Sequence, residues 1–149
     1  MVWTPRVTVA AVVEHEGKFL LVEEDTGQVD HTVFNQPAGH LEAGESLINA
    51  VIRETLEETG YDFTPTELIG IYRWIEPDSG DTFLRVCFTG RLGRHYPDHP
   101  LDDGIVGPRW LSPQQLSQLG TSLRSPLVQR CIDDYSAGHR YPLSLLADM

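Results

Sequence analysis

The alternation of apolar and polar residues along the chain predicts two β-hairpins. The first is expected over residues 6–24, where RVTVAAVVE and GKFLLVEE flank the turn His15-Glu16-Gly17. The second is expected over residues 67–90, where ELIGIYRWIE and DTFLRVCFTG flank the strong turn formers Pro77-Asp78-Ser79-Gly80. The polar residues 25–34 predict a loop, and residues 108–111 predict one more strand.

Three segments carry the start and stop signals of helices. The first runs over about residues 46–59, and Gly60 stands in the usual capping place beyond its end. The other two each open with a serine followed by a proline, at Ser112 and at Ser125, and the last ends near Gly138. Because no crossover helix separates the strands of the hairpins, this order of elements predicts an α+β fold with a mixed sheet packed between helices.

Length and composition indicate one ordinary globular domain over residues 1–149, with 40% hydrophobic residues. No apolar run approaches the roughly 20 residues of a membrane span. The start, MVWTPR, lacks the apolar segment of a signal peptide. Cys87 and Cys131 have apolar neighbours, which favours buried thiols over a disulfide. We therefore expect a cytoplasmic protein, either a monomer or a small homo-oligomer.

The net charge of −11 narrows the class of partner. Nucleic acid polymers and anionic membranes are both bound through a basic footprint, so neither is expected here. An anionic small molecule is still compatible with this charge, because a metal cation can invert the local field of an acidic site.

Three glutamates of the predicted first helix share one side of it. At about 100° per residue, Glu57 and Glu58 lie near −60° and +40° from Glu54, so the carboxylates span an arc of about 100°. The opposite side carries apolar residues and is expected to be the core stripe, and it consists of Ile48, Ile52 and Leu56.

Such an arc is usually a solvated face, but the residues around it favour a metal site. Leu47, Ala50 and Val51 lie on the glutamate side, which predicts that protein covers this side as well. Like charges at this spacing also cost about 0.2–0.5 kcal/mol per pair, a repulsion that a bound divalent cation would turn into ligation. Hard oxygen ligands of this kind suit Mg²⁺, and Mn²⁺ can substitute for it.

The spacing around these glutamates resembles the Nudix box. Its seven fixed positions all match within 22 residues: Gly39, Glu45, Arg53, Glu54, Glu57, Glu58 and Gly60. Two softer positions of the box, where an aliphatic residue is preferred, hold Thr55 and Tyr61, and both concern packing. The chain is therefore identified as a member of the Nudix hydrolase family. This resemblance implies the family's α/β/α sandwich and a magnesium-dependent hydrolysis of a phosphoanhydride bond.

The resemblance also implies a role for each matched residue. Glu54, Glu57, Glu58 and the backbone carbonyl of Gly39 correspond to the metal ligands. Glu45 and Arg53 correspond to an ion pair that fixes the loop against the helix. The catalytic base varies in this family; Glu54 is the first candidate, and a loop carboxylate, Asp102 or Asp103, is the second.

Segments outside the box resemble one bacterial subgroup of the family, the NudJ-like phosphatases. These segments are VTVAAVV, FNQPAGHLEAGESL, RWIEPD, LRSPLV and GHRYPL, which together extend the resemblance over most of the chain. The subgroup implies nucleoside di- and triphosphates, or the hydroxymethylpyrimidine diphosphate of thiamine metabolism, as substrates. An ADP-sugar or dinucleoside-polyphosphate hydrolase stays open as an alternative, as does a non-catalytic nucleotide-sensing module on the same fold.

Substrate-binding residues outside the box are predicted with alternatives. Trp74 alternates with Tyr72 and Leu68 on one strand face, where it can stack a substrate ring or pack in the core. Three arginines can clamp phosphate or form ordinary surface ion pairs, and these are Arg73, Arg85 and Arg124.

Overall fold

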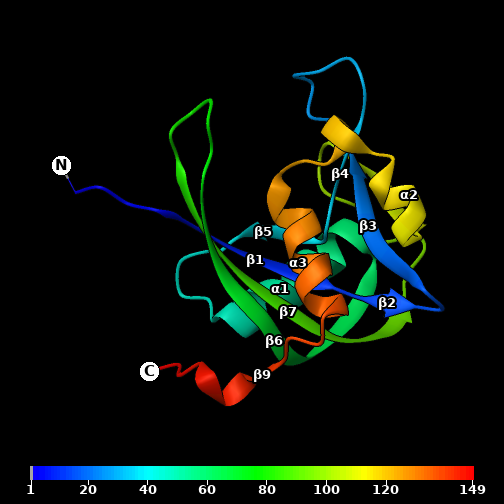
Figure 1. Ribbon diagram of the computed structural model, residues 1–149. Helices are drawn as coiled ribbons and strands as arrows, with labels where there is room; N and C mark the ends of the chain where they lie inside the picture. Colours follow the sequence, from blue (N-terminus) through cyan, green and yellow to red (C-terminus); the bar gives the residue numbers. More distant parts are fainter. Residues whose placement is uncertain (1) are drawn as a thin grey trace.

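The strands form two sheets in the computed structural model, which describes residues 2–149 (Figure 1). The larger sheet has the order β5-β1-β7-β6-β9. Its strands are β1 (Arg6–Val12), β5 (Ala38–His40), β6 (Tyr61–Ile75), β7 (Thr82–His95) and β9 (Tyr141–Pro142). The pair β1–β7 is parallel and the other pairs are antiparallel, so this sheet is mixed.

The second sheet is antiparallel and is built around β3. It pairs with β2, β4 and β8. The bounds of these strands are β2 (Glu14–His15), β3 (Lys18–Glu24), β4 (Val33–Asn35) and β8 (Ile105–Leu111).

The three predicted helices are present, with the predicted caps. Ser46 caps α1 (Leu47–Thr59) through a hydrogen bond from the Asn49 N–H, and Gly60 ends it in the left-handed conformation. Ser112 and Ser125 cap α2 (Pro113–Ser117) and α3 (Pro126–Ser136) in the same way. Two short 3₁₀ turns, η1 (Gly120–Ser122) and η2 (Leu143–Leu145), complete the described chain.

The larger sheet lies between α1 and α3, which confirms the predicted α/β/α sandwich (Figure 1). Residues of β1 and of Val13 just beyond it alternate between two buried clusters. Val9, Ala11 and Val13 pack in the cluster that contains Ala50 and Val51 of α1. Ala10 and Val12 pack in the cluster that contains Val128 and Ile132 of α3. A central strand buried on both faces needs an unbroken apolar run, which this segment supplies.

The predicted first hairpin is wrong in its pairing. β1 lies between β5 and β7 in the larger sheet, whereas β3 belongs to the second sheet. The turn at His15-Glu16-Gly17 joins β3 only to the two-residue strand β2. Because both edges of β1 are already paired, the chain leaves the sheet after Val13 and starts the second sheet.

The predicted core stripe of α1 is also wrong. The buried residues of this helix are Ala50, Val51, Glu54, Thr55, Glu58 and Thr59, whereas Ile48, Ile52 and Leu56 are only partly buried. The glutamate side therefore packs against the sheet, as Ala50 and Val51 indicated. The buried hydroxyl of Thr55 donates to the Val51 carbonyl at 2.8 Å, which explains how a polar residue is tolerated there.

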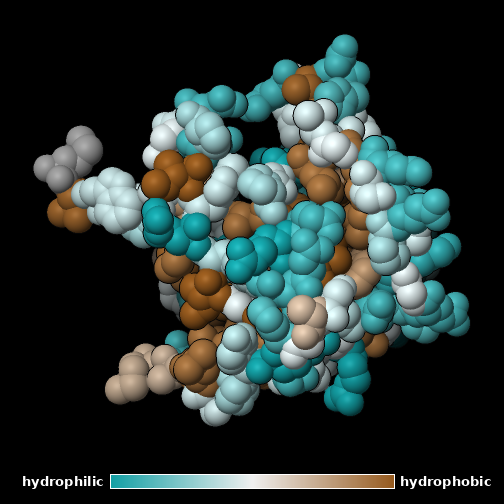
Figure 2. All heavy atoms as spheres, viewed as in Figure 1, coloured by the Kyte–Doolittle hydropathy of each residue, from teal (hydrophilic) through white to brown (hydrophobic). Residues whose placement is uncertain are grey.

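Hydrophilic residues dominate the face shown in Figure 2, and hydrophobic ones are more frequent toward the side that carries the two termini. Within residues 2–149, no helix has the length and apolar character needed to span a membrane.

Candidate active site

The carboxylates of α1 meet a fourth one from the loop before β8. Single oxygens of Glu54, Glu57 and Asp102 all lie within 4.8 Å of one another. Asp102 is held there by its own backbone, since its N–H donates to the Glu57 carbonyl at 3.2 Å. Of the two loop acids considered as a second base, Asp102 joins this cluster and Asp103 does not, although both line a neighbouring hollow together with Glu58.

Two of these carboxylates are buried, and their pKa values reflect it. Glu54 and Glu58 keep 8% and 7% of their surface exposed. Burial, with the nearby charges of Glu57 and Asp102, raises the pKa of Glu54 to about 7. Burial raises the pKa of Glu58 to about 9, although the Ala38 N–H donates to Glu58 Oε1 at 2.8 Å and opposes the shift. The protein thus gathers carboxyl groups where solvation is poor, and burial there favours their protonated forms.

Gly39 lets the β5 backbone approach Glu54 closely. A Cβ at this position would lie 2.1 Å from the Glu54 Cδ atom, far inside van der Waals contact. The glycine is therefore required by space, since its φ is not in the left-handed region. Gly39 and Glu54 line the same cavity, as the predicted ligand set requires, and ligation by the Gly39 carbonyl stays a prediction.

The predicted ion pair between Arg53 and Glu45 is present and two-pronged. Arg53 Nε donates to Glu45 Oε2 at 2.6 Å, and Nη2 donates to Oε1 at 2.9 Å. Nη2 also donates to the His40 carbonyl at 3.1 Å, which ties the helix to the end of β5. Nη1 reaches Glu54 and Glu57 at 2.8 and 3.1 Å, so the same guanidinium also orients two carboxylates of the cluster.

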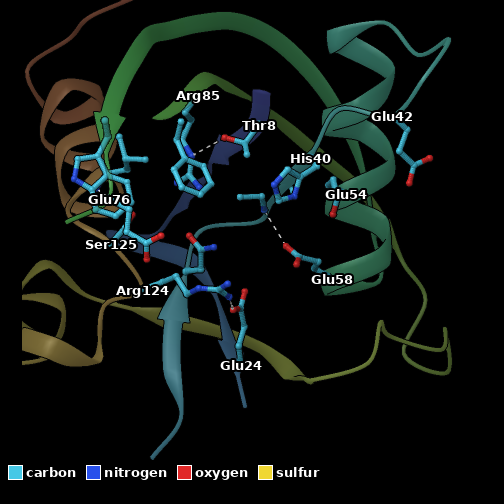
Figure 3. A pocket seen from close by; sticks show the side chains of 16 residues that line it. Thr8, Glu24, His40, Glu42, Glu54, Glu58, Glu76, Arg85, Arg124 and Ser125 are labelled. Carbon is cyan, nitrogen blue, oxygen red and sulfur yellow. Dashed lines mark hydrogen bonds and ion pairs between the residues drawn. The ribbon is translucent and has the colours of Figure 1, made fainter. Parts of the chain in front are cut away.

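A cavity of about 490 Å³ opens beside these acids. In Figure 3, Glu54 and Glu58 reach it from α1, while Arg85 and Arg124 reach it from other sides. Its lining also includes the rings of His40, Trp74 and Phe83. The cavity therefore has an acidic wall, formed by Glu54 and Glu58, and faces it with two arginines and aromatic rings.

Arg85 does not form the surface ion pair that was considered for it. It is only 6% exposed, and it donates to Gln36 Oε1 at 2.9 Å and to Thr8 Oγ1 at 3.4 Å (Figure 3). Arg124 does form an ion pair, with the buried Glu24, while its own side chain stays half-exposed at the cavity.

Trp74 lines the cavity and is partly buried, and its ring centroid lies 5.8 Å from that of Phe83. The predicted alternation with Leu68 is wrong, because a β-bulge between Leu68 and Gly70 turns Leu68 toward the α1 side of the sheet. Arg73 is exposed and lies in a different surface hollow beside Pro126 and Arg130. Trp74 also lines that hollow, but Glu54, Arg85 and Arg124 do not, so the structure puts Arg73 apart from most of the predicted site.

The site residues missed from the sequence include Thr8, Asn35 and Phe83, which line the cavity, and Gln36, which binds Arg85. Phe83 had a usable signal, since it stands two residues from Arg85 and shares its strand face. The other three reach the site through strand pairing and a loop turn, which have no local signature in the chain.

Comparison with known proteins decides the family. The NUDIX domain model matches residues 4–131. The chain belongs to the Nudix family. The phosphatase NudJ of Escherichia coli strain K12 is 46% identical over 144 residues, which are 97% of this chain and 92% of the relative. The phosphatase NudJ of Shigella flexneri matches to the same extent.

Solved structures agree with this assignment. A Nudix hydrolase from Nitrosomonas europaea is 49% identical, with a TM-score of 0.95 over 98% of both chains. A UDP-X diphosphatase is 20% identical, with a TM-score of 0.74 over 95% of this chain and 68% of its own, and so shares the fold alone. The resemblance to the NudJ-like subgroup is thereby confirmed. The chain is a Nudix hydrolase of acid anhydrides, and the reading as a non-catalytic sensing module is set aside.

Proposed function

We propose that the protein uses Mg²⁺ to hydrolyse a phosphoanhydride bond in a nucleoside di- or triphosphate or in hydroxymethylpyrimidine diphosphate. The observation that carries this proposal is that Glu54 and Glu58 share one cavity with Arg124 and the ring of Trp74. A substrate that joins a flat ring to a short phosphate chain has matching chemistry at both ends.

The residues present fit a hard divalent cation. Glu54, Glu57 and Asp102 offer oxygens within 4.8 Å of one another, and burial of Glu54 and Glu58 leaves their charge poorly compensated by water. Glu54, Glu57, Glu58 and the Gly39 carbonyl would hold the ion, and Mn²⁺ would serve in place of Mg²⁺. When bound, the metal would supply positive charge that neutralises phosphate oxygens and acidifies water.

The chain's own residues carry the remaining work. Glu54 accepts the proton of the attacking water, with Asp102 as the second candidate. The new P–O bond forms in line with the anhydride bond that breaks, and the leaving phosphate departs with that bond's electron pair. Arg53 and Glu45 position the acidic wall, Arg124 binds phosphate, and Trp74 stacks on the ring.

The size of the cavity supports a compact substrate. A volume of about 490 Å³ is near the lower end of ordinary ligand pockets. The relatives called phosphatase NudJ, at 46% identity, support a phosphatase activity on small phosphate compounds. We therefore rank an ADP-sugar or a dinucleoside polyphosphate below a mononucleotide or a single-ring diphosphate.

A phosphate-release screen tests the proposal. Hydroxymethylpyrimidine diphosphate, nucleoside di- and triphosphates, ADP-ribose and diadenosine polyphosphates are compared by kcat/KM at saturating MgCl₂. The compact substrates are expected to lead, and chelation is expected to abolish turnover until magnesium is restored. Full activity in chelator would overturn the metal dependence. A lead of more than about tenfold for ADP-ribose or a diadenosine compound, about 1.4 kcal/mol, would overturn the substrate class.

A further inference from the structure

Strand register puts the inner part of the cavity away from the acidic wall. Thr8 of β1 pairs with His40 on one side and with Arg85 on the other, so these three residues form one row across the sheet. Strands are about 4.8 Å apart, which puts the backbone of Arg85 about 10 Å from that of β5, where Gly39 touches Glu54. The backbone of Arg85 thus lies two strands away from the close approach of Gly39 to Glu54, in the part of the sheet that also carries the aromatic rings.

The rings of the cavity lie next to Arg85 in the same sheet. Phe83 stands two residues from Arg85 on β7, and Trp74 of β6 pairs with Phe83. A substrate ring that packs against Phe83 and Trp74 therefore presents one of its edges to Arg85. Arg85 would therefore contact that edge of the ring and not the phosphate chain.

Arg85 has more N–H donors than its protein partners use. Its Nε and Nη1 donate to neutral oxygens of Thr8 and Gln36, and in the described part of the chain Nη2 donates to no protein acceptor. A guanidinium has five N–H donors and no acceptor, so its ligand must supply an acceptor. Because only 6% of Arg85 is exposed, water is a poor substitute for that acceptor.

Asn35 supplies a hydrogen-bond acceptor in the same cavity. It is 6% exposed, lines the same cavity, and precedes Gln36, which binds Arg85. Its Oδ1 atom is buried without any hydrogen-bond partner among residues 2–149. A buried acceptor that finds no donor in the protein destabilises the fold, so a ligand donor at this point is favoured.

We propose that Arg85 and Asn35 read the edge of the substrate ring, Arg85 donating to a ring acceptor and Asn35 Oδ1 accepting from a donor beside it. The ligand class is a heteroaromatic ring with an acceptor next to a donor, such as a ring nitrogen beside an amino group. This inference rests on the proposed function, because it assigns a substrate ring to that cavity. If Arg85 bound phosphate instead, its removal would weaken the hydrolysis of every diphosphate alike, whatever the ring.

Two matched diphosphates test this reading. Hydroxymethylpyrimidine diphosphate carries a ring nitrogen beside an amino group, and benzyl diphosphate has the same ring size and the same phosphate chain without either. The wild-type protein, Arg85→Met and Asn35→Ala are assayed with both, and the ratio of the two kcat/KM values is compared. Both substrates meet the same preparation, so a loss of folded protein cancels in the ratio.

The wild-type protein is expected to prefer the pyrimidine by about tenfold or more, and Arg85→Met is expected to bring this ratio close to one. Asn35→Ala is expected to reduce the ratio by about threefold to tenfold. Arg91→Met, which changes an exposed arginine on the same strand, is the control and leaves the ratio unaltered. Calorimetry with the two monophosphates gives the same comparison without turnover.

Three results overturn the inference. They are a wild-type ratio near one, an Arg85→Met protein that loses both substrates equally, and an Asn35→Ala protein with an unchanged ratio. In each case magnesium-dependent hydrolysis persists, so the proposed function stands. If no phosphoanhydride is hydrolysed in the screen, the proposed function itself fails.

Discussion

At the scale of single residues, the acidic wall is held by contacts that work against charge repulsion. Glu58 accepts the Ala38 N–H, and Glu54 and Glu57 both accept from Arg53. These hydrogen bonds fix the direction of each carboxylate, but they leave more negative charge than Arg53 alone can balance. The arrangement is understandable as a site whose remaining positive charge comes from a ligand.

Glu57→Gln tests whether that carboxylate binds the metal. The change keeps the size of the side chain and removes one charge, so the thermal unfolding midpoint is expected to stay close to that of the wild type. Turnover is expected to fall by about 10²–10³, the usual cost of losing a key electrostatic group. Turnover within about threefold of the wild type at saturating magnesium would show that Glu57 does not touch the metal.

Gly39→Ala tests the close approach of β5 to Glu54. The added methyl group would collide with the Glu54 carboxylate, so the side chain must move and turnover is expected to drop at least tenfold. Gly93→Ala is the matched control, because its Cβ meets Asp62 on the paired strand, with Cβ at 3.2 Å and the carbonyl oxygen at 3.9 Å, and no carboxylate of the cluster. Steady-state kinetics on both variants decide the matter, and equal activity of the two would contradict the argument.

At the scale of elements, α1 and the loop before it act as one unit. Ser46 caps the helix, and the Glu45–Arg53 pair links this loop to the middle of α1. The Arg53 side chain is 22% exposed and that of Glu45 is 14% exposed, so solvent screens this pair only partly. The helix position, and with it the carboxylate cluster, therefore depends on a contact outside the cluster.

A double-mutant cycle measures this link. Glu45→Ala and Arg53→Ala are each expected to lower the free energy of unfolding. The coupling energy between the two residues is expected to be about 1–3 kcal/mol, a value between those of a surface ion pair and a buried one. Arg53→Ala is expected to cost more, because it also frees Glu54 and Glu57 from their common partner. Chemical denaturation of the four proteins gives the energies, and strict additivity would contradict the link.

The elements also show what the sequence could predict. Caps are local, so Ser46, Gly60 and the Ser-Pro pairs predicted the helix bounds correctly. Strand pairing is not local, and nothing within residues 6–24 indicates that β7 takes the edge of β1. The buried face of α1 was mistaken for the same reason, since Glu58 lies on it with a hydrogen-bond partner from the separate strand β5.

The site divides in the same way. One continuous motif contains Glu54, Glu57, Glu58, Gly39 and the Glu45–Arg53 pair, so its resemblance to the Nudix box was enough to select them. Arg85, Asn35 and Trp74 come from separate strands, and register and a β-bulge decide which of them reach the cavity. Arg73 and Arg85 read alike in the sequence, yet one is exposed and the other is buried at the cavity.

At the scale of the whole molecule, the net charge of −11 must be reconciled with an anionic substrate. Arg85 and Arg124 put positive charge inside the cavity, although negative charge prevails over the chain as a whole. A bound cation would add to that positive charge at the acidic wall. General screening of surface charge and specific binding at the cavity are therefore two separate effects of added salt.

Thermal unfolding separates these two effects. A ligand that binds the folded state at about 100 times its Kd adds about 2.7 kcal/mol, which for a domain of this size raises the Tm by about 5–10 °C. MgCl₂ is expected to do this, and KCl at equal ionic strength is expected to raise the Tm much less, because it only screens repulsion among exposed carboxylates. Glu57→Gln should reduce the increment from MgCl₂ while keeping that from KCl, because one ligand is lost and the net charge barely changes. If KCl raises the Tm as far as MgCl₂ does, the stabilisation comes from screening of the whole molecule, and the carboxylates of α1 hold no metal.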